Sequence, residues 1–426
     1  MSKPIAVVSC PIDTYSGYGA RARDFVKALI KTDKYDVKIL SQRWGNTRFG
    51  YLDDHKEGDL SSRIIPNLTA QPELWIQITV PNEFQKVGKY NIGVTAGIET
   101  TQCDGSWIEG VNRMDLNLVS AEHAKTVFEQ TKYNIQDKNT QQITGTLELT
   151  SKVEVLFEGA DLTKYFPKSS NAIDLSTVKE DFAFLFVGHW MQGDIGEDRK
   201  NVGFMIKAFM ESFKNKKNPP ALILKTMQVG SSIMDRERIL DKIDAIRRTI
   251  KGGKAPNVYL FHGEVSDQEI NQLYNHPKVK AMISFTKGEG FGRPLLEFSL
   301  VKKPLIVSGW SGHTDFLDKE LVLMVGGELR KVHKSAAQKN MILEEASWFA
   351  PNELEAAQAM KIVFKQYNKL LINAKKQGTR NAKQFSFEKM AELLDSILDS
   401  NVPEFPKEIK LTLPKLQLPK LEKIDG

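Results

Sequence analysis

Short apolar runs alternate with helical stretches along most of the chain, and this alternation starts twice. In the first half, the apolar runs at 5–10 and 74–80 are separated by an amphipathic stretch at 20–31, among others. The pattern restarts at 182–188, after a polar segment at 166–181 that contains Pro and several Ser residues. Short apolar runs between helices are typical of parallel strands that are buried on both faces. The sequence therefore predicts an α/β protein with two Rossmann-like, doubly wound parallel sheets that face each other.

The length of the chain supports a division into two domains. At 426 residues, it exceeds what a single ordinary hydrophobic core accommodates. We expect a first domain at 1–165, a linker at 166–181 and a second domain at 182–375. The tail at 401–426 carries the repeat LPKLQLPKL and is expected to be extended, because Pro at this density does not continue a helix.

Composition excludes several classes of protein. No run approaches 18 consecutive apolar residues, so a membrane-spanning helix is not expected. Two cysteines, Cys10 and Cys103, exclude a disulfide framework and fit a reduced, cytoplasmic setting. The net charge of +6 permits a nucleic acid or an anionic membrane surface as a partner without requiring one. We expect a cytoplasmic protein, and peripheral binding to a membrane surface stays open.

The segment TKGEGFGRPLLEFS at 286–299 carries the strongest chemical signal. It follows an apolar run at 281–285, and Pro294 is suited to the first turn of a helix. Glycines let backbone N–H groups approach a ligand, and a helix N-terminus favours phosphate. Glu289 and Glu297 are separated by seven residues. Their carboxylates can accept hydrogen bonds from sugar hydroxyls. The segment suits a nucleotide sugar; the alternative is a glycine turn with a capping Glu289 and a solvated Glu297.

The string EGFGRPLLE resembles the E-x7-E motif of the retaining, family 4-like glycosyltransferases of the GT-B class. Three further segments resemble that family in the same order: 153–166, 184–209 and 258–274. The resemblance covers most of residues 1–400. It implies metal-independent transfer of a sugar from a nucleotide-diphosphate sugar to an acceptor hydroxyl, with retained configuration. It also implies that a helix at about 376–400 returns to the first domain.

The resemblance assigns roles to the residues of the motif. It places Glu297 on the donor ribose and Glu289 near hydroxyls of the donor sugar, with the backbone N–H groups between them facing sugar and phosphate. Lys200 is expected on the diphosphate. Fixed cations there stabilise the negative charge that the diphosphate gains as the glycosidic bond breaks.

One position departs from the family pattern. The family usually has Arg directly after the glycine that ends the first strand of the second domain, and this chain has His189. The missing charge has three candidate sources: Arg199, Lys225 and Arg293. The alternative for Lys225 is a solvated lysine at a strand end.

The expected site has a catalytic, a donor-binding and an acceptor-side group. For each acceptor-side residue, the alternative interpretation is that it is a polar loop residue without a role in binding. The expected catalytic residues are Glu289, Lys200 and Arg293. The expected donor-binding residues are Gly17, Gly19, His189, Arg199, Lys225, Gly290, Phe291, Gly292 and Glu297. The expected acceptor-side residues are Glu99 and Asp104.

Other polar residues are expected to be structural. Ser120 is expected to cap the helix that follows it, and His123 is expected on that helix's surface. The sequence has no spacing of carboxylates and histidines that is typical of a metal site, so we expect no metal and no cofactor besides the nucleotide sugar.

The acceptor stays open at this point. We expect a glycan or a lipid-linked saccharide. The alternative acceptors are a modified, hydroxylated base in nucleic acid, a protein side chain and a small metabolite. A further alternative is a non-catalytic nucleic-acid-binding protein on the same fold.

Overall fold

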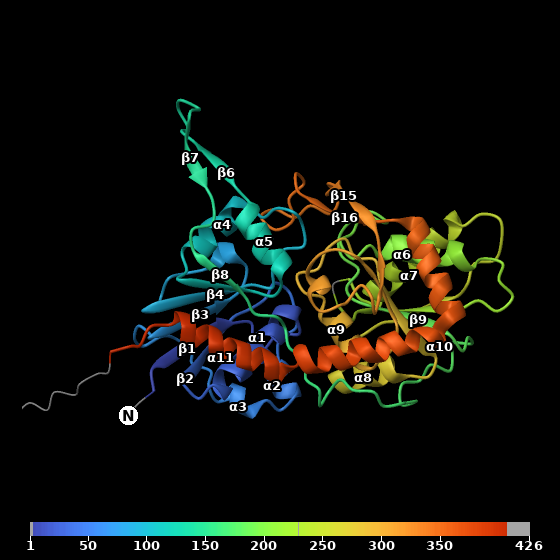
Figure 1. Ribbon diagram of the computed structural model, residues 1–426, viewed down its shortest axis with the longest axis horizontal. Helices are drawn as coiled ribbons and strands as arrows, with labels where there is room; N and C mark the ends of the chain where they lie inside the picture. Colours follow the sequence, from blue (N-terminus) through green and yellow to red (C-terminus); the bar gives the residue numbers. More distant parts are fainter. Residues whose placement is uncertain (1–2, 229, 407–426) are drawn as a thin grey trace, which may run out of the picture.

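The computed structural model describes residues 3–228 and 230–406. Its first half contains a six-stranded sheet in the order β2-β1-β3-β4-β5-β8, and every neighbouring pair is parallel. This sheet lies on the left side of the view in Figure 1. Its strands are β1 (Ile5–Cys10), β2 (Asp36–Ser41), β3 (Leu74–Ile78), β4 (Tyr90–Val94), β5 (Leu116–Val119) and β8 (Lys152–Val155).

The second half contains another six-stranded parallel sheet, in the order β11-β10-β9-β12-β13-β14. Its strands are almost entirely buried at the centre, which explains why they read as continuous apolar runs. The two sheets confirm the predicted α/β architecture. The strands are β9 (Ala183–Val187), β10 (Ala221–Lys225), β11 (Val258–Phe261), β12 (Val279–Ser284), β13 (Leu305–Ser308) and β14 (Leu323–Val325).

Helices cover both faces of each sheet and create four hydrophobic cores. In the first half, α1 and α11 pack on one face and α4 and α5 on the other. In the second half, α6, α7 and α10 cover one face, and α8 and α9 cover the other. The helices are α1 (Gly17–Lys31), α4 (Gly105–Asn112), α5 (Glu122–Gln130), α6 (Val202–Phe213), α7 (Ile233–Thr249), α8 (Asp267–Asn275), α9 (Arg293–Leu300), α10 (Glu353–Gln384) and α11 (Phe387–Asn401).

The end of the described chain returns to the first sheet. α10 is interrupted by a non-helical residue, Gln366, and its second part runs toward the first sheet, where α11 follows it (Figure 1). Met390, Leu394 and Leu398 of α11 are buried in the same core as α1. The described segment 156–182 contains no helix or sheet strand. The LPKLQLPKL repeat lies outside the described residues.

Several elements were not expected from the sequence. The β6–β7 hairpin projects from the first domain (Figure 1), and β15 pairs with β16 beside the second sheet. No helix among the described residues is long and apolar enough to cross a membrane. The remaining elements are α2 (Tyr51–Asp54), α3 (Gly58–Ser61), η1 (Pro81–Glu83), β6 (Tyr133–Gln136), β7 (Ile143–Leu147), η2 (Gly312–Asp315), β15 (Gly327–Lys331) and β16 (Ser347–Pro351).

From the sequence, SGYG at 16–19 is expected as a turn before the helix at 20–31. This expectation is wrong, because α1 already begins at Gly17. Ser16 caps the helix through its side chain, which accepts a hydrogen bond from the N–H of Gly19 at 2.9 Å. A Cβ on Gly19 would lie 2.3 Å from the carbonyl oxygen of Thr14. Close backbone packing, rather than a turn conformation, therefore requires glycine at position 19.

Candidate active site

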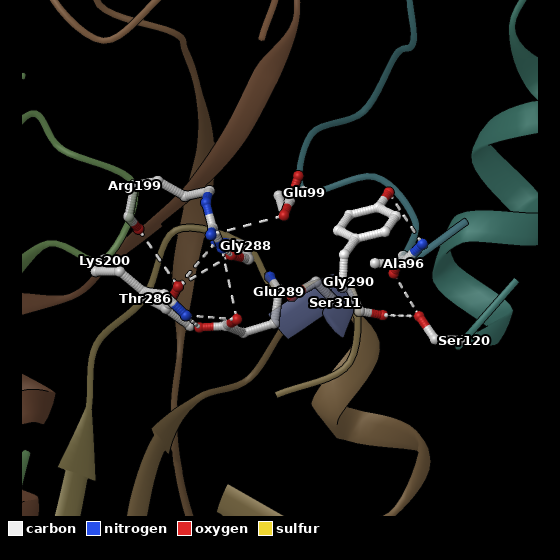
Figure 2. Close-up of polar contacts among 11 residues, drawn as sticks. Ala96, Glu99, Ser120, Arg199, Lys200, Thr286, Gly288, Glu289, Gly290 and Ser311 are labelled. Carbon is white, nitrogen blue, oxygen red and sulfur yellow. Dashed lines mark hydrogen bonds and ion pairs between the residues drawn. The ribbon is translucent and has the colours of Figure 1, made fainter. Parts of the chain in front are cut away.

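The carboxyl ends of the two sheets meet through two loops, one after β4 and one after β12. A Cβ on Gly288 would lie 1.9 Å from the carbonyl oxygen of Glu99, and one on Gly290 would lie 2.3 Å from that of Ala96. Ser120 Oγ donates a hydrogen bond to the carbonyl oxygen of Gly290 at 3.1 Å (Figure 2). The glycines of the motif thus let the two domains approach each other at the edge where ligands of parallel sheets bind.

Glu289 lies at the centre of a buried charged group. Lys200 Nζ is 2.6 and 2.7 Å from its two carboxylate oxygens, and Arg199 approaches one of them at 3.5 Å (Figure 2). Arg199 also lies 3.6 Å from Glu99 of the first domain. Burial opposes ionisation of Glu289, but Lys200 and Arg199 outweigh it and hold the pKa of Glu289 at about 2. Three of the predicted site residues and the acceptor-side Glu99 are therefore in contact.

The glycine loop presents unpaired backbone donors. The N–H groups of Gly290, Phe291 and Gly292 donate to no acceptor among the described residues. Gly292 has a φ of +97°, which glycine adopts readily, and it is followed directly by the first residue of α9. Free N–H groups at a helix N-terminus bind anions and sugar oxygens.

Lys225 ends β10 and lies beside the end of β9, where the N–H of Gly188 donates to its carbonyl oxygen at 3.1 Å. His189 follows this contact. Burial lowers the pKa of His189, and the charges of Lys200, Lys225 and Arg199 lower it further. Lys225 is buried, and its ammonium group donates to the carbonyl oxygen of Gly263 without contacting a carboxylate among the described residues. It is not the solvated strand-end lysine that was the alternative.

Arg293 is engaged differently. Its guanidinium lies 2.5 Å from Asp24 of α1, 2.9 Å from Glu297 and 3.7 Å from Glu158. Burial raises the pKa of Glu297 to about 7, although Arg293 lowers it. Because three carboxylates already surround Arg293, Lys225 is the better candidate for the charge that His189 does not supply.

The remaining expected residues have structural roles. Gly17 is the first residue of α1 and Gly19 packs on Thr14. Asp104 caps α4 and accepts hydrogen bonds from the N–H and hydroxyl of Ser106.

Two expectations for the helix α5 are wrong. Ser120 does not cap it, because its hydroxyl donates to the carbonyls of Ala96 and Gly290. His123 is half-buried between the domains rather than on the surface, and its ring lies 4.5 Å from that of Trp310. The docking of α5 on the second domain, which the sequence of the helix does not reveal, explains both errors.

Sequence reasoning missed the loop after β13. Ser311 Oγ accepts a hydrogen bond from the N–H of Glu289 at 2.9 Å, and the N–H of Gly312 donates to the carbonyl of Glu289 at 3.0 Å. His313 is fully buried beside this contact. The apolar run PLIVS at 304–308 indicates a strand from the sequence alone, and it forms β13. The strand-end rule for parallel sheets was therefore the signal that could have identified SGHTD.

A cavity of about 1020 Å³ adjoins the site without containing its central charges. It is lined by Lys287 and Trp348, among others, rather than by Glu289 or Lys200. Among the described residues, no group of three or more His, Cys, Asp or Glu side chains is arranged to hold a metal ion. Metal independence stays a prediction.

No protein-family model matches the sequence, and no curated protein matches it. Solved structures do match over nearly the whole chain. A glycosyltransferase from Rickettsia africae ESF-5 matches with a TM-score of 0.61 at 12% identity, covering 94% of this chain and 99% of that one. Sucrose-phosphate synthase from Thermosynechococcus elongatus matches with a TM-score of 0.59 at 13% identity, covering 93% and 98%.

HepE from Anabaena, in complex with UDP-glucose, matches with a TM-score of 0.59 at 12% identity, covering 93% of this chain and all of that one. The chain has the GT-B fold. The charged group around Glu289 thus lies where the two domains of a GT-B protein face each other. At this level of identity the similarity establishes the fold, and activity has to be argued from the residues.

Proposed function

We propose that this protein is a retaining glycosyltransferase that moves a sugar from a nucleotide-diphosphate sugar to an acceptor hydroxyl. The observation that carries the proposal is the juxtaposition of opposite binding groups at one sheet edge. Glu289 supplies an ionised acceptor for sugar hydroxyls, and Gly290 to Gly292 supply free N–H donors beside it. Lys200 supplies a cation in contact with Glu289, and Lys225 supplies a second cation at the end of β10 in the same sheet. A nucleotide sugar needs all three kinds of group.

The cations act on the leaving group. The bond between the anomeric carbon and the diphosphate oxygen breaks, and the diphosphate gains negative charge. Lys200, Arg199 and Lys225 then stabilise the transition state more than the bound substrate, because the charge they meet grows during the step. The ion pair with Glu289 already positions the ammonium group of Lys200 in this structure. The donor phosphate would therefore share this ammonium group with Glu289.

The acceptor attacks from the first-domain side. Its hydroxyl oxygen bonds to the anomeric carbon on the face from which the diphosphate departs, which retains configuration. Its proton passes to the departing phosphate oxygen, so the step needs no protein nucleophile. Glu99 of the first domain lies 3.6 Å from Arg199, where it can orient the hydroxyl. Its negative charge favours an uncharged glycan or lipid-linked saccharide over a polyphosphate such as nucleic acid.

A donor screen tests this proposal. Purified protein is incubated with UDP-, GDP-, ADP- and dTDP-sugars, and nucleotide release is measured with and without candidate glycan acceptors. We expect release from one nucleotide class, and a loss of release in Lys225→Ala but not in Lys254→Ala, a control at an exposed loop lysine. No release from any donor, with or without acceptors, contradicts the proposal.

A further inference from the structure

His313 carries a buried polar atom that has no hydrogen-bond partner among the described residues. It lies in η2, which follows β13 at the same sheet edge. The ring is fully buried, and its Nε2 lies 2.7 Å from the carbonyl oxygen of Ser308. A carbonyl only accepts, so the proton of this imidazole is on Nε2 and Nδ1 keeps its lone pair. Nδ1 is buried and has no hydrogen-bond partner among the described residues.

The ring lies against the glycine loop. A Cβ on Gly292 would be 3.0 Å from the Cβ of His313, so the histidine packs directly on this loop. Its neighbours in sequence, Ser311 and Gly312, hydrogen-bond to the backbone of Glu289. His313 is therefore tied to the residues that supply the free N–H donors and the carboxylate of the candidate site.

Burial keeps the ring neutral. It lowers the pKa of His313, while the hydrogen bond to Ser308 and the charge of Glu289 act in the opposite direction and the charge of Lys200 acts with burial. A neutral imidazole with Nε2 committed to Ser308 can only accept at Nδ1. Buried acceptors in native proteins are satisfied by a donor, and the ligand argued for this loop is rich in hydroxyl donors.

We propose that His313 is a specificity-determining residue, whose Nδ1 accepts a hydrogen bond from one hydroxyl of the donor sugar. This assignment rests on the proposed function and deepens it. The nucleotide is recognised by cations and backbone groups, whereas His313 and Glu289 read the sugar. The protein is then expected to discriminate between sugars that differ at that hydroxyl.

Two substitutions separate this role from a structural one. His313→Gln keeps a donor at about the position of Nε2, so it retains the bond to Ser308 but removes the acceptor at Nδ1. His313→Asn keeps an acceptor, because its amide oxygen lies at about the same distance from the backbone as Nδ1. The asparagine side chain is too short to reach the carbonyl of Ser308, so that hydrogen bond is lost. Melting temperatures show which variants are folded.

The experiment is calorimetry with the nucleotide sugar that the wild type binds, the parent nucleotide diphosphate and the monodeoxy series of that sugar. We expect the wild type and His313→Asn to lose roughly tenfold in affinity for one deoxy analogue. His313→Gln is expected to bind the nucleotide diphosphate as the wild type does, and to bind that deoxy analogue and its parent sugar equally.

Two results overturn the assignment. In the first, His313→Gln discriminates the deoxy series as the wild type does. In the second, His313→Asn loses discrimination while His313→Gln keeps it, because the bond to Ser308 is then what matters. A wild type that binds no nucleotide sugar contradicts the proposed function itself, and it is distinguishable because the other results require a binding wild type.

Discussion

At the scale of single residues, the site is defined by how its charges are paired. Lys200 and Arg199 neutralise Glu289, whereas Arg293 neutralises Glu297 together with Asp24. The two glutamates of the motif therefore differ in state. Glu289 is fully ionised, and Glu297 has a pKa close to neutrality.

Lys200→Ala is expected to lower turnover by about 10²–10³ and donor affinity by much less. The ammonium meets a charge that grows in the transition state. Lys207→Ala, at an exposed position of α6, serves as the control. Steady-state kinetics and donor titration measure the two effects, and turnover within a few-fold of the wild type would move the role to Arg199 or Lys225.

Glu297→Ala is expected to weaken donor binding, because the carboxylate, ionised above a pH of about 7, accepts hydrogen bonds from the ribose. Loss of a charged hydrogen bond costs about 1.5–3 kcal/mol. Calorimetry measures the donor affinity, and a melting curve checks the fold. Unchanged affinity in a normally folded variant would remove Glu297 from the donor site.

The raised pKa of Glu297 also predicts how the free energy of unfolding changes with pH. Its pKa rises from 4.5 to about 7 in the folded state, so between these values the folded protein binds the proton and the unfolded chain releases it. The free energy of unfolding of the wild type should therefore fall, relative to Glu297→Gln, as the pH rises from about 4.5 to about 7. The difference should be on the order of 2 kcal/mol.

Urea unfolding of the wild type and Glu297→Gln at several pH values measures this difference. Glu353→Gln, at an exposed position of α10, provides the control. Parallel pH profiles for the wild type and Glu297→Gln would show that the raised pKa is not a property of the folded protein.

At the scale of elements, the contact between the loops after β4 and β12 determines how closely the domains approach. Gly290→Ala places a methyl group 2.3 Å from the carbonyl of Ala96, and backbone on that side cannot yield easily. We expect at least a tenfold loss of turnover. Gly58→Ala is the matched control, since nothing lies within 4 Å of its added Cβ. Equal activity of both variants would contradict the importance of this contact.

The elements with strong periodicity were predictable, and those formed by distant contacts were not. The central strands of both sheets were predicted correctly because burial on both faces leaves continuous apolar runs, as in β9 and β12, whereas the three-residue edge strand β14 was not predicted. The β6–β7 hairpin was missed because it is largely exposed, including Ile135 and Ile143, so no core imposes a pattern on it.

The candidate site was predictable only in part. The motif identified Glu289 and the glycine loop, and the strand-end position identified Lys225. The contact of Arg293 with Asp24 joins residues 269 positions apart, and no local signal indicates it. The sequence therefore named the charged residues without showing which of them neutralise one another.

At the scale of the whole molecule, the two domains contact each other through polar groups beside the site. Arg293 reaches Asp24, and Thr101 exchanges hydrogen bonds with Ser347 through its N–H and its hydroxyl. Interfaces of this polar kind permit relative motion of domains. We predict that the domains close on the donor and exclude water from the reacting groups.

Small-angle scattering with and without saturating nucleotide sugar measures closure. The wild type is expected to compact on binding. Asp24→Asn removes one carboxylate from Arg293 and is expected to compact less and to bind the donor several-fold more weakly, whereas Asp36→Asn on β2 should behave as the wild type. Identical curves for the wild type with and without donor would contradict closure.

Calorimetric titration of the wild type with nucleotide diphosphates and nucleotide sugars, in the presence of EDTA, tests the central claim most directly. The account predicts one saturable site per chain for one nucleotide class, with binding weakened by Lys225→Ala and by Glu297→Ala and unaffected by Lys254→Ala. Binding that requires added Mg²⁺ or Mn²⁺ would contradict metal independence. The absence of binding to every nucleotide, with or without metal, would contradict the assignment of this sheet edge as a nucleotide-sugar site.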